Sequence, residues 1–104
     1  MVNPYAGEVA VTIDGQLHVC KLTLGALAEL EVALGEDTLI ALVQRFEAGA
    51  YSSRDVMALL VAGLRGGGWE GKADDLRTVE FAGGPVGAAQ TAAQLLARAF
   101  TPPT

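Results

Sequence analysis

The chain has 104 residues, of which 51% are hydrophobic and 18% charged, and its formal net charge is -5 at pH 7. This size and composition predict one domain with a hydrophobic core and argue against a disordered chain. The seven Lys and Arg residues are scattered along an acidic chain, so we expect no nucleic-acid binding.

Two strand-like runs come first, over about residues 8–22. Hydrophobic residues alternate with polar or small ones from Val9 to Ile13, which is the period of a β-strand. Asp14-Gly15 predicts a type I′ turn, because both central residues of that turn need positive φ. The turn predicts a register that pairs Ile13 with Gln16, Val11 with His18 and Val9 with Cys20. One face of the hairpin is then apolar and consists of Val9, Val11, Ile13, Cys20 and Leu22.

Capping signals predict two helices after the hairpin. Thr23 is a suitable N-cap for the first, which Gly35 ends. Asp37 is the predicted cap of the second helix, which extends through about Glu47. The expected core-facing residues are Leu24, Leu27, Leu30 and Leu34 in the first helix and Leu39, Leu42, Val43 and Phe46 in the second.

A third helix begins at Ser52 or Ser53, where Ser52-x-x-Asp55 resembles a capping box. Hydrophobic residues occupy most sides of this helix, so we expect it at the centre of the core. Gly66-Gly67-Gly68 stops it.

A short helix is predicted from about Ala73 to Phe81, and Gly83-Gly84-Pro85 interrupts the chain after it. The last helix extends to about Phe100, and its three-and-four spacing predicts an apolar stripe of Val86, Ala89, Ala93, Leu96 and Phe100. The predicted fold is therefore α+β, an N-terminal β-hairpin followed by a compact bundle of four to five short helices. We expect one domain over residues 1–104, with the hairpin at about 8–22, the helical body at about 23–100 and a short tail at 101–104.

Residues able to carry out chemistry are few. His18 and Cys20 are the only residues of their types, and together they cannot form a four-ligand zinc site. The strand-like context of Cys20 predicts a buried thiol rather than a reactive one. We therefore predict no catalytic, metal or cofactor site and no enzyme activity. No secretory signal or membrane-spanning run is recognisable, so a cytoplasmic protein is expected.

Three features are more typical of protein recognition. Trp69 lies in a glycine-rich connection, where it either folds back over the core or anchors a partner. The last helix carries Arg98 as its only charge, and it either completes the core or exposes a seam for another helix. An open hairpin edge could add a partner strand. The predicted partner-binding residues are Trp69, Leu76, Phe81, Leu96 and Phe100.

Parts of the chain also resemble a known family. The distinguishing runs are DGQ at the hairpin turn, LTLGALAELE at the start of the first helix and AGLRGGG near residue 68. Over residues 3–68 the chain resembles the small tail proteins of gene transfer agents and related prophages of alphaproteobacteria. That family is grouped with phage tail assembly chaperones, although some descriptions call its members tail tube proteins.

The resemblance implies a small cytoplasmic factor that binds the tape measure protein, the tail tube protein, or both, during tail assembly. It implies no catalytic or ligand-contacting residue at a particular position. A tube subunit contributes several long strands to a ring, whereas this sequence predicts a single hairpin, so we favour a chaperone over a structural tube component. Self-association is compatible with either role. A small adaptor unconnected with phages is a further alternative, with no motif in its favour.

Overall fold

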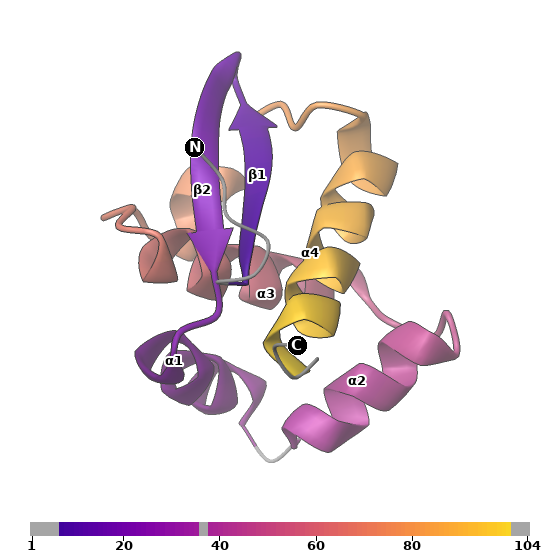
Figure 1. Ribbon diagram of the computed structural model, residues 1–104. Helices are drawn as coiled ribbons and strands as arrows, with labels where there is room; N and C mark the ends of the chain where they lie inside the picture. The colour runs from indigo at the N-terminus through magenta and orange to yellow at the C-terminus, as the bar shows by residue number, and fades with distance from the viewer. Residues whose placement is uncertain (1–6, 36–37, 101–104) are drawn as a thin grey trace.

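The computed structural model describes residues 7–35 and 38–100. Strands β1 (Glu8–Ile13) and β2 (Gln16–Lys21) are followed by helices α1 (Leu24–Leu34), α2 (Leu39–Glu47), α3 (Ser53–Gly66), a 3-10 turn η2 (Ala73–Leu76) and α4 (Gly84–Phe100). Figure 1 shows α4 on the β1 side of the hairpin and α1 beyond the end of β2. The structure confirms the predicted α+β fold, with an N-terminal hairpin followed by helices.

The predicted hairpin is confirmed in register and turn. Val9 pairs with Cys20 and Ile13 pairs with Gln16 in an antiparallel ladder. Asp14 and Gly15 have φ values of 50° and 79°, the positive values that a type I′ turn requires. The apolar face faces the core, where all five predicted residues are buried: Val9, Val11, Ile13, Cys20 and Leu22.

The predicted helix from Ala73 to Phe81 is wrong beyond Leu76. The chain after η2 turns back to β1 instead, where Phe81 forms an isolated antiparallel bridge with Ile13. The Asp14 amide donates to the Glu80 carbonyl at 2.8 Å, and the Glu80 amide donates to Asp14 Oδ1 at 2.9 Å. These bonds join residues far apart in the sequence, and they replace the local bonds that a helix would have made.

Hydroxyl side chains cap the first two helices. Thr23 caps α1 as predicted, because its side chain accepts a bond from the Ala26 amide at 3.0 Å. Thr38 is the N-cap of α2 and accepts from the Ala41 amide, whereas the predicted cap, Asp37, lies outside the described residues. Leu24 was predicted to face the core, but its side chain is 84% exposed. It is the first residue of α1, before the turn that packs on α3.

Helix α3 lies at the centre of the core, as its hydrophobic composition predicted, with Leu59, Leu60 and Leu64 buried. The predicted stripe of α4 is partly wrong. Ala88, Ala92 and Leu95 are buried together with Leu96, whereas Val86 is 68% and Phe100 49% exposed. Alanines occupy both sides of this helix, so the sequence pattern does not distinguish two stripes one residue apart.

Candidate protein-interaction surfaces

The one cysteine and the one histidine of the chain both lie on β2. Cys20 is fully buried, and burial raises the pKa of its thiol to about 12. His18 is half-buried on the same strand. Within residues 7–35 and 38–100, no three His, Cys, Asp or Glu side chains are grouped as metal ligands would be. No described helix is both long and apolar enough to cross a membrane.

An apolar hollow runs along α4, and we call it the α2–α4 groove. It consists of two adjoining cavities of about 600 and 330 Å³ that share Phe46 and Ala93. Phe46 stacks on Tyr51 with ring centroids 4.5 Å apart. Among the described residues that line the groove, Glu47 is the one that is charged. The hydrophobic lining includes Val43, Val56, Pro85, Val86, Leu96 and Phe100. A surface of this kind suits an apolar protein segment.

Two predicted partner-binding residues, Leu96 and Phe100, come together in this groove. Leu96 is only 4% exposed and forms part of its floor, whereas Phe100 is half-exposed at one end. The sequence analysis missed Phe46 and Tyr51 as groove residues. Their aromatic character in an aromatic-poor chain was a usable signal, but their stacking depends on the turn between α2 and α3.

The other three candidates lie outside that groove. Trp69 is half-buried and packs against the core, which matches the fold-back alternative, and its ring lies over Gly71. Leu76 is buried and Phe81 is half-buried beside β1. Their role in partner binding stays a prediction, and Leu76 exposes little surface to a partner.

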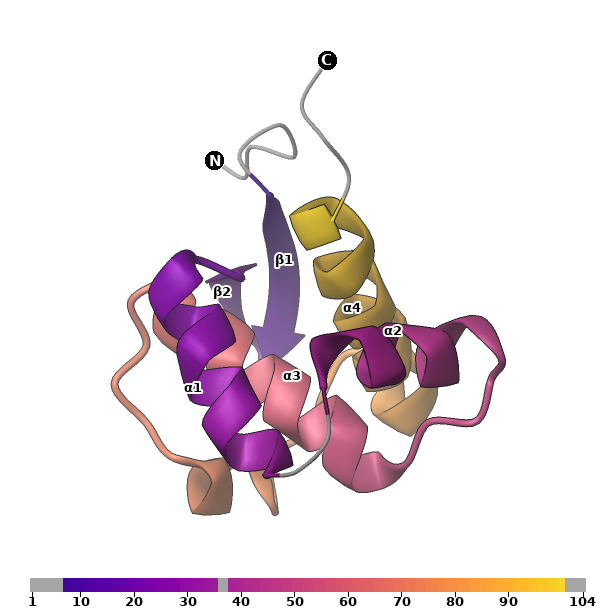
Figure 2. The same ribbon diagram turned by 90° about the horizontal axis from the view of Figure 1, so that it is seen from below.

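A second hollow, which we call the α1–α3 groove, has a volume of about 460 Å³. Its apolar part includes Leu30, Met57 and Val61. Among the described residues, three basic residues line it, Arg54, Arg65 and Lys72, and Glu29 is the one acid. Seen from below in Figure 2, α1 lies alongside α3, whereas α2 lies near α4. The two grooves therefore belong to different helix pairs.

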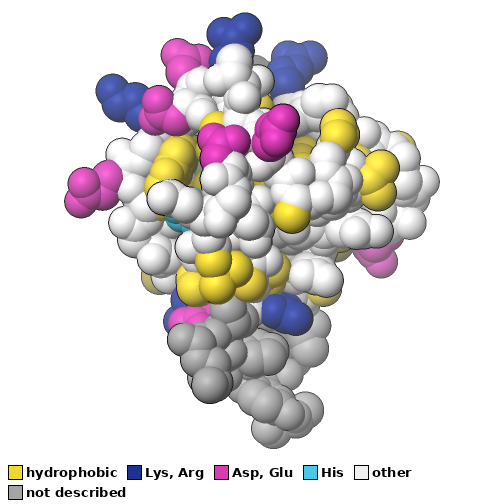
Figure 3. Space-filling model, turned by 90° about the horizontal axis from the view of Figure 1, so that it is seen from above, with side chains coloured by type: hydrophobic (Ala, Val, Ile, Leu, Met, Phe, Trp, Pro, Cys, Tyr) yellow, Lys and Arg dark blue, Asp and Glu magenta, His cyan; other side chains and the backbone are white. Residues whose placement is uncertain are grey.

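The exposed hydrophobic side chains on the face seen in Figure 3 do not form one continuous patch. On the face seen from above in Figure 3, they form several separate patches between charged and neutral groups. Leu17 on β2 and Val86 on α4 are among the exposed residues, at 69% and 68%. Scattered exposure of this kind is ordinary for a folded protein, so the lined grooves are better candidates for docking.

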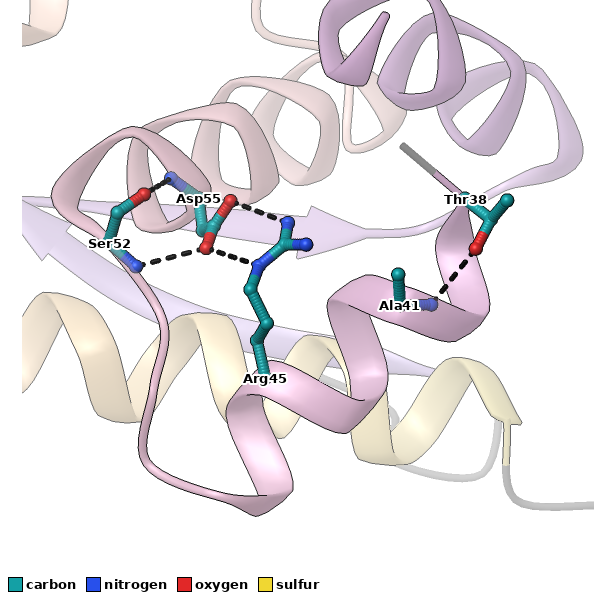
Figure 4. A network of polar contacts seen from close by, with 5 residues as sticks. All are labelled: Thr38, Ala41, Arg45, Ser52 and Asp55. Atoms are coloured by element: carbon teal, nitrogen blue, oxygen red, sulfur yellow. Dashed lines mark hydrogen bonds and ion pairs between the residues drawn. The ribbon is translucent and has the colours of Figure 1, made fainter. Parts of the chain in front are cut away.

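An ion-pair network sets the position of α2 relative to α3 (Figure 4). Arg45 Nε donates to Asp55 Oδ2 and Nη2 to Oδ1, both at 2.9 Å. Asp55 also closes the predicted capping box, since its carboxylate accepts from the Ser52 amide and its own amide donates to Ser52 Oγ. The Arg45 hydrogen bonds hold the pKa of the Asp55 carboxyl below its usual value, although burial acts in the opposite direction.

A family model described as "Phage tail tube protein, GTA-gp10" matches residues 6–101 of this chain. The chain belongs to that family. Membership supports the predicted relation to gene transfer agent and phage tails, and it favours a tail role over an adaptor unconnected with phages. No curated protein and no solved structure gives a significant match.

The description of the GTA-gp10 family fits our alternative, a tail tube component, better than the chaperone interpretation. The way in which this family member holds its hairpin therefore matters, because open strand edges are a usual means of joining one subunit to the next. On β1, the outward-facing carbonyl of Thr12 accepts from the Ala82 amide at 3.0 Å. The Glu8 carbonyl accepts from the Arg98 side chain. Two outward-facing carbonyls of β1, those of Thr12 and Glu8, are thus bonded within the same chain.

The outer edge of β2 faces the end of α3. Thr12, whose carbonyl faces outward, pairs with Leu17, so the backbone groups of Leu17 also face outward. These groups alternate in direction along a strand, so those of Val19 and Lys21 face outward as well. A Cβ atom built on Gly67 would lie 1.8 Å from the Val19 carbonyl oxygen, and one on Gly66 would lie 2.0 Å from that of Lys21. The glycines that stop α3 therefore let its backbone lie against the Val19 and Lys21 part of the second edge of this GTA-gp10 hairpin.

Proposed function

We propose that this GTA-gp10 family protein is a tail assembly chaperone, which binds the tail tube protein or the tape measure protein while the tail is built in the host cytoplasm. The observation that carries the proposal is that the chain itself lies against part of each hairpin edge. Ala82 and Arg98 bond the outer edge of β1, and Gly66 and Gly67 lie against β2.

Strand edges are the usual means of extending a sheet from one subunit to the next. A two-stranded sheet with part of each edge already in contact with its own chain offers little for building a continuous ring of strands. The surfaces that remain for binding are made of side chains, above all the α2–α4 groove. A small protein that binds an unassembled subunit through such a groove would stabilise its soluble form by mass action.

A structural component of the tail tube is the second candidate, and the family description favours it. In that role the protein would join its neighbours through helix faces instead of strand edges. The two candidates differ in what remains in the finished particle. A component is present in many copies, whereas a chaperone leaves.

The test is co-expression with the tail tube and tape measure proteins, followed by affinity purification and by mass spectrometry of purified particles. We expect a stable complex before assembly and few or no copies in the particle. Many copies in the particle would establish the component role instead. If neither tail protein is bound and the solubility of both is unchanged, the chaperone proposal fails.

A matched pair of variants connects binding to the α2–α4 groove. Phe100→Glu places a charge at a half-exposed lining position, and Leu17→Glu places the same charge on the exposed face of the hairpin. We expect capture of the tail protein to fall by about tenfold or more for Phe100→Glu and to be unchanged for Leu17→Glu. Equal loss in both variants would contradict the assignment to this groove.

A further inference from the structure

We propose that the α1–α3 groove binds an amphipathic helix with acidic flanks, supplied by a partner protein. The inference deepens the proposed function, and rests on it, because it states the chemistry of one segment that the protein recognises. Three of the seven basic residues of the chain line this one groove, and among the described residues Glu29 is the one acid that lines it. The protein as a whole has a net charge of -5, so the groove departs from the sign of its surroundings.

The basic residues are arranged along a helical stripe. Arg54 and Arg65 lie at the two ends of the lining stretch of α3, and Met57 and Val61 lie between them at helical spacing. The two arginines are eleven positions apart along the helix, a length of about 16 Å. Lys72 adds a third cation from the segment before η2. The groove therefore has an apolar floor of about three helical turns with an arginine at each end.

Two of the three cations that line the groove, Arg54 and Lys72, are available to a partner. Arg65 pairs with Glu29 at 2.9 Å and also donates to the Gly71 carbonyl, so its charge is already compensated. Arg54 and Lys72 are exposed, and their side chains form no ion pair with any residue in the described parts of the chain. A bound helix can therefore add two ion pairs without breaking one.

The apolar floor of the α1–α3 groove determines which side chains of a partner fit between Arg54 and Lys72. Met57 and Val61 are half-buried, and Leu30 and Ala62 are buried below them. A helix that places apolar side chains at i, i+3 or i+4, and i+7 matches this floor, and methionine adapts to side chains of different shape. Carboxylates on either side of that stripe would then reach Arg54 and Lys72. Charge complementarity of this kind acts mainly on partner choice and on the rate of association.

The experiment titrates the full chain with a fluorescein-labelled peptide of about 15 residues, which forms a helix with leucines on one face and glutamates beside them. We expect saturable binding that weakens as salt is raised. A peptide of the same sequence with lysines in place of the glutamates should bind at least about tenfold more weakly. Equal binding of both peptides, or no binding of the acidic one, would overturn the inference.

Variants of the protein assign the binding to the groove. The double variant Arg54→Glu with Lys72→Glu should weaken binding of the acidic peptide by about tenfold or more. It should fold, since a glutamate at position 54 lies in the first turn of α3, where negative charge is favourable. Arg77→Glu is the matched control, because Arg77 is an exposed cation that is not among the groove residues. An equal effect of the control would overturn the assignment.

The same variants separate this inference from the proposed function. If the tail protein is captured by wild type and equally by the Arg54→Glu, Lys72→Glu variant, the groove is not its docking site and the inference fails, while the chaperone proposal stands. If wild type captures no tail protein but binds the acidic peptide in a groove-dependent way, the chaperone proposal fails and the groove assignment stands without it.

Discussion

Arg45 of α2 and Asp55 of α3 form a two-pronged ion pair, with both nitrogen–oxygen distances at 2.9 Å. The Asp55 side chain is 10% exposed and that of Arg45 26%. The pair therefore lies at the boundary between core and solvent, where it joins the end of α2 to the beginning of α3. Since α2 also forms one wall of the α2–α4 groove, this contact controls the shape of the candidate docking surface.

Replacing the planar guanidinium should weaken this connection. Arg45→Lys keeps the charge but loses one of the two parallel hydrogen bonds, so we expect the free energy of unfolding to fall by about 1–2 kcal/mol. Urea unfolding followed by circular dichroism measures the change. Arg54 is an exposed cation without an ion-pair partner in the described parts of the chain. Arg54→Lys should therefore change the free energy of unfolding by less than about 0.5 kcal/mol. Similar losses in both variants would contradict a specific role for the pair.

The same carboxylate predicts a pH dependence. The pKa of Asp55 is lowered in the folded protein, so its charged form contributes stability above its unfolded value of about 4. That contribution is lost as the pH falls through the lower folded value. The difference in unfolding free energy between wild type and Asp55→Asn should therefore be constant near neutral pH and shrink below about pH 4. A difference that is the same at pH 7 and at pH 2 would be incompatible with this assignment.

Close backbone packing predicts a large effect at Gly67. An added methyl group would overlap the Val19 carbonyl, so Gly67→Ala should destabilise the fold by about 3 kcal/mol. Gly25→Ala is the matched control, since its nearest neighbour would be Thr23 Oγ1 at 3.9 Å and alanine favours a helix. The control should be neutral or stabilising by up to about 1 kcal/mol. Thermal unfolding of the two variants tests both expectations.

Burial predicts that Cys20 reacts only when the hairpin opens. With the pKa raised to about 12, the thiolate fraction at pH 8 is about a thousandfold lower than for an exposed thiol, and the side chain has no exposed surface. Labelling by a coloured disulfide reagent should be slow in buffer and immediate in denaturant. Rapid labelling of the folded protein would show that β2 separates from α3 under native conditions.

Local signals in the sequence predicted the hairpin and most helix boundaries. Asp14-Gly15 specified the turn and register, and Thr23 and Ser52 marked two helix starts through hydrogen bonds to nearby amides. The hydrogen bond between the Glu80 amide and Asp14 could not be predicted from local signals, because it joins residues that are far apart in the sequence. Asp74 and Asp75 are acidic residues that favour the beginning of a helix, but the helix that begins at Ala73 ends after a single 3-10 turn.

The candidate surfaces were less predictable than the elements. Leu96 and Phe100 were identified from their spacing on one helix, and the structure places both in the α2–α4 groove. The basic lining of the α1–α3 groove was not identified, since Arg54, Arg65 and Lys72 are separated in sequence and looked like scattered charges. They come together because α3 carries two of them on one stripe and the chain beyond it brings the third back.

The bond from Arg98 to the Glu8 carbonyl has a consequence for synthesis on the ribosome. The hairpin is translated first, but the residues that cover the outer edge of β1, Ala82 and Arg98, are among the last of the described fold to be made. Until they emerge, the nascent chain exposes an unpaired strand edge. Ribosome-bound chains stalled before residue 82 should therefore be prone to pair with one another, and release of α4 should end that exposure.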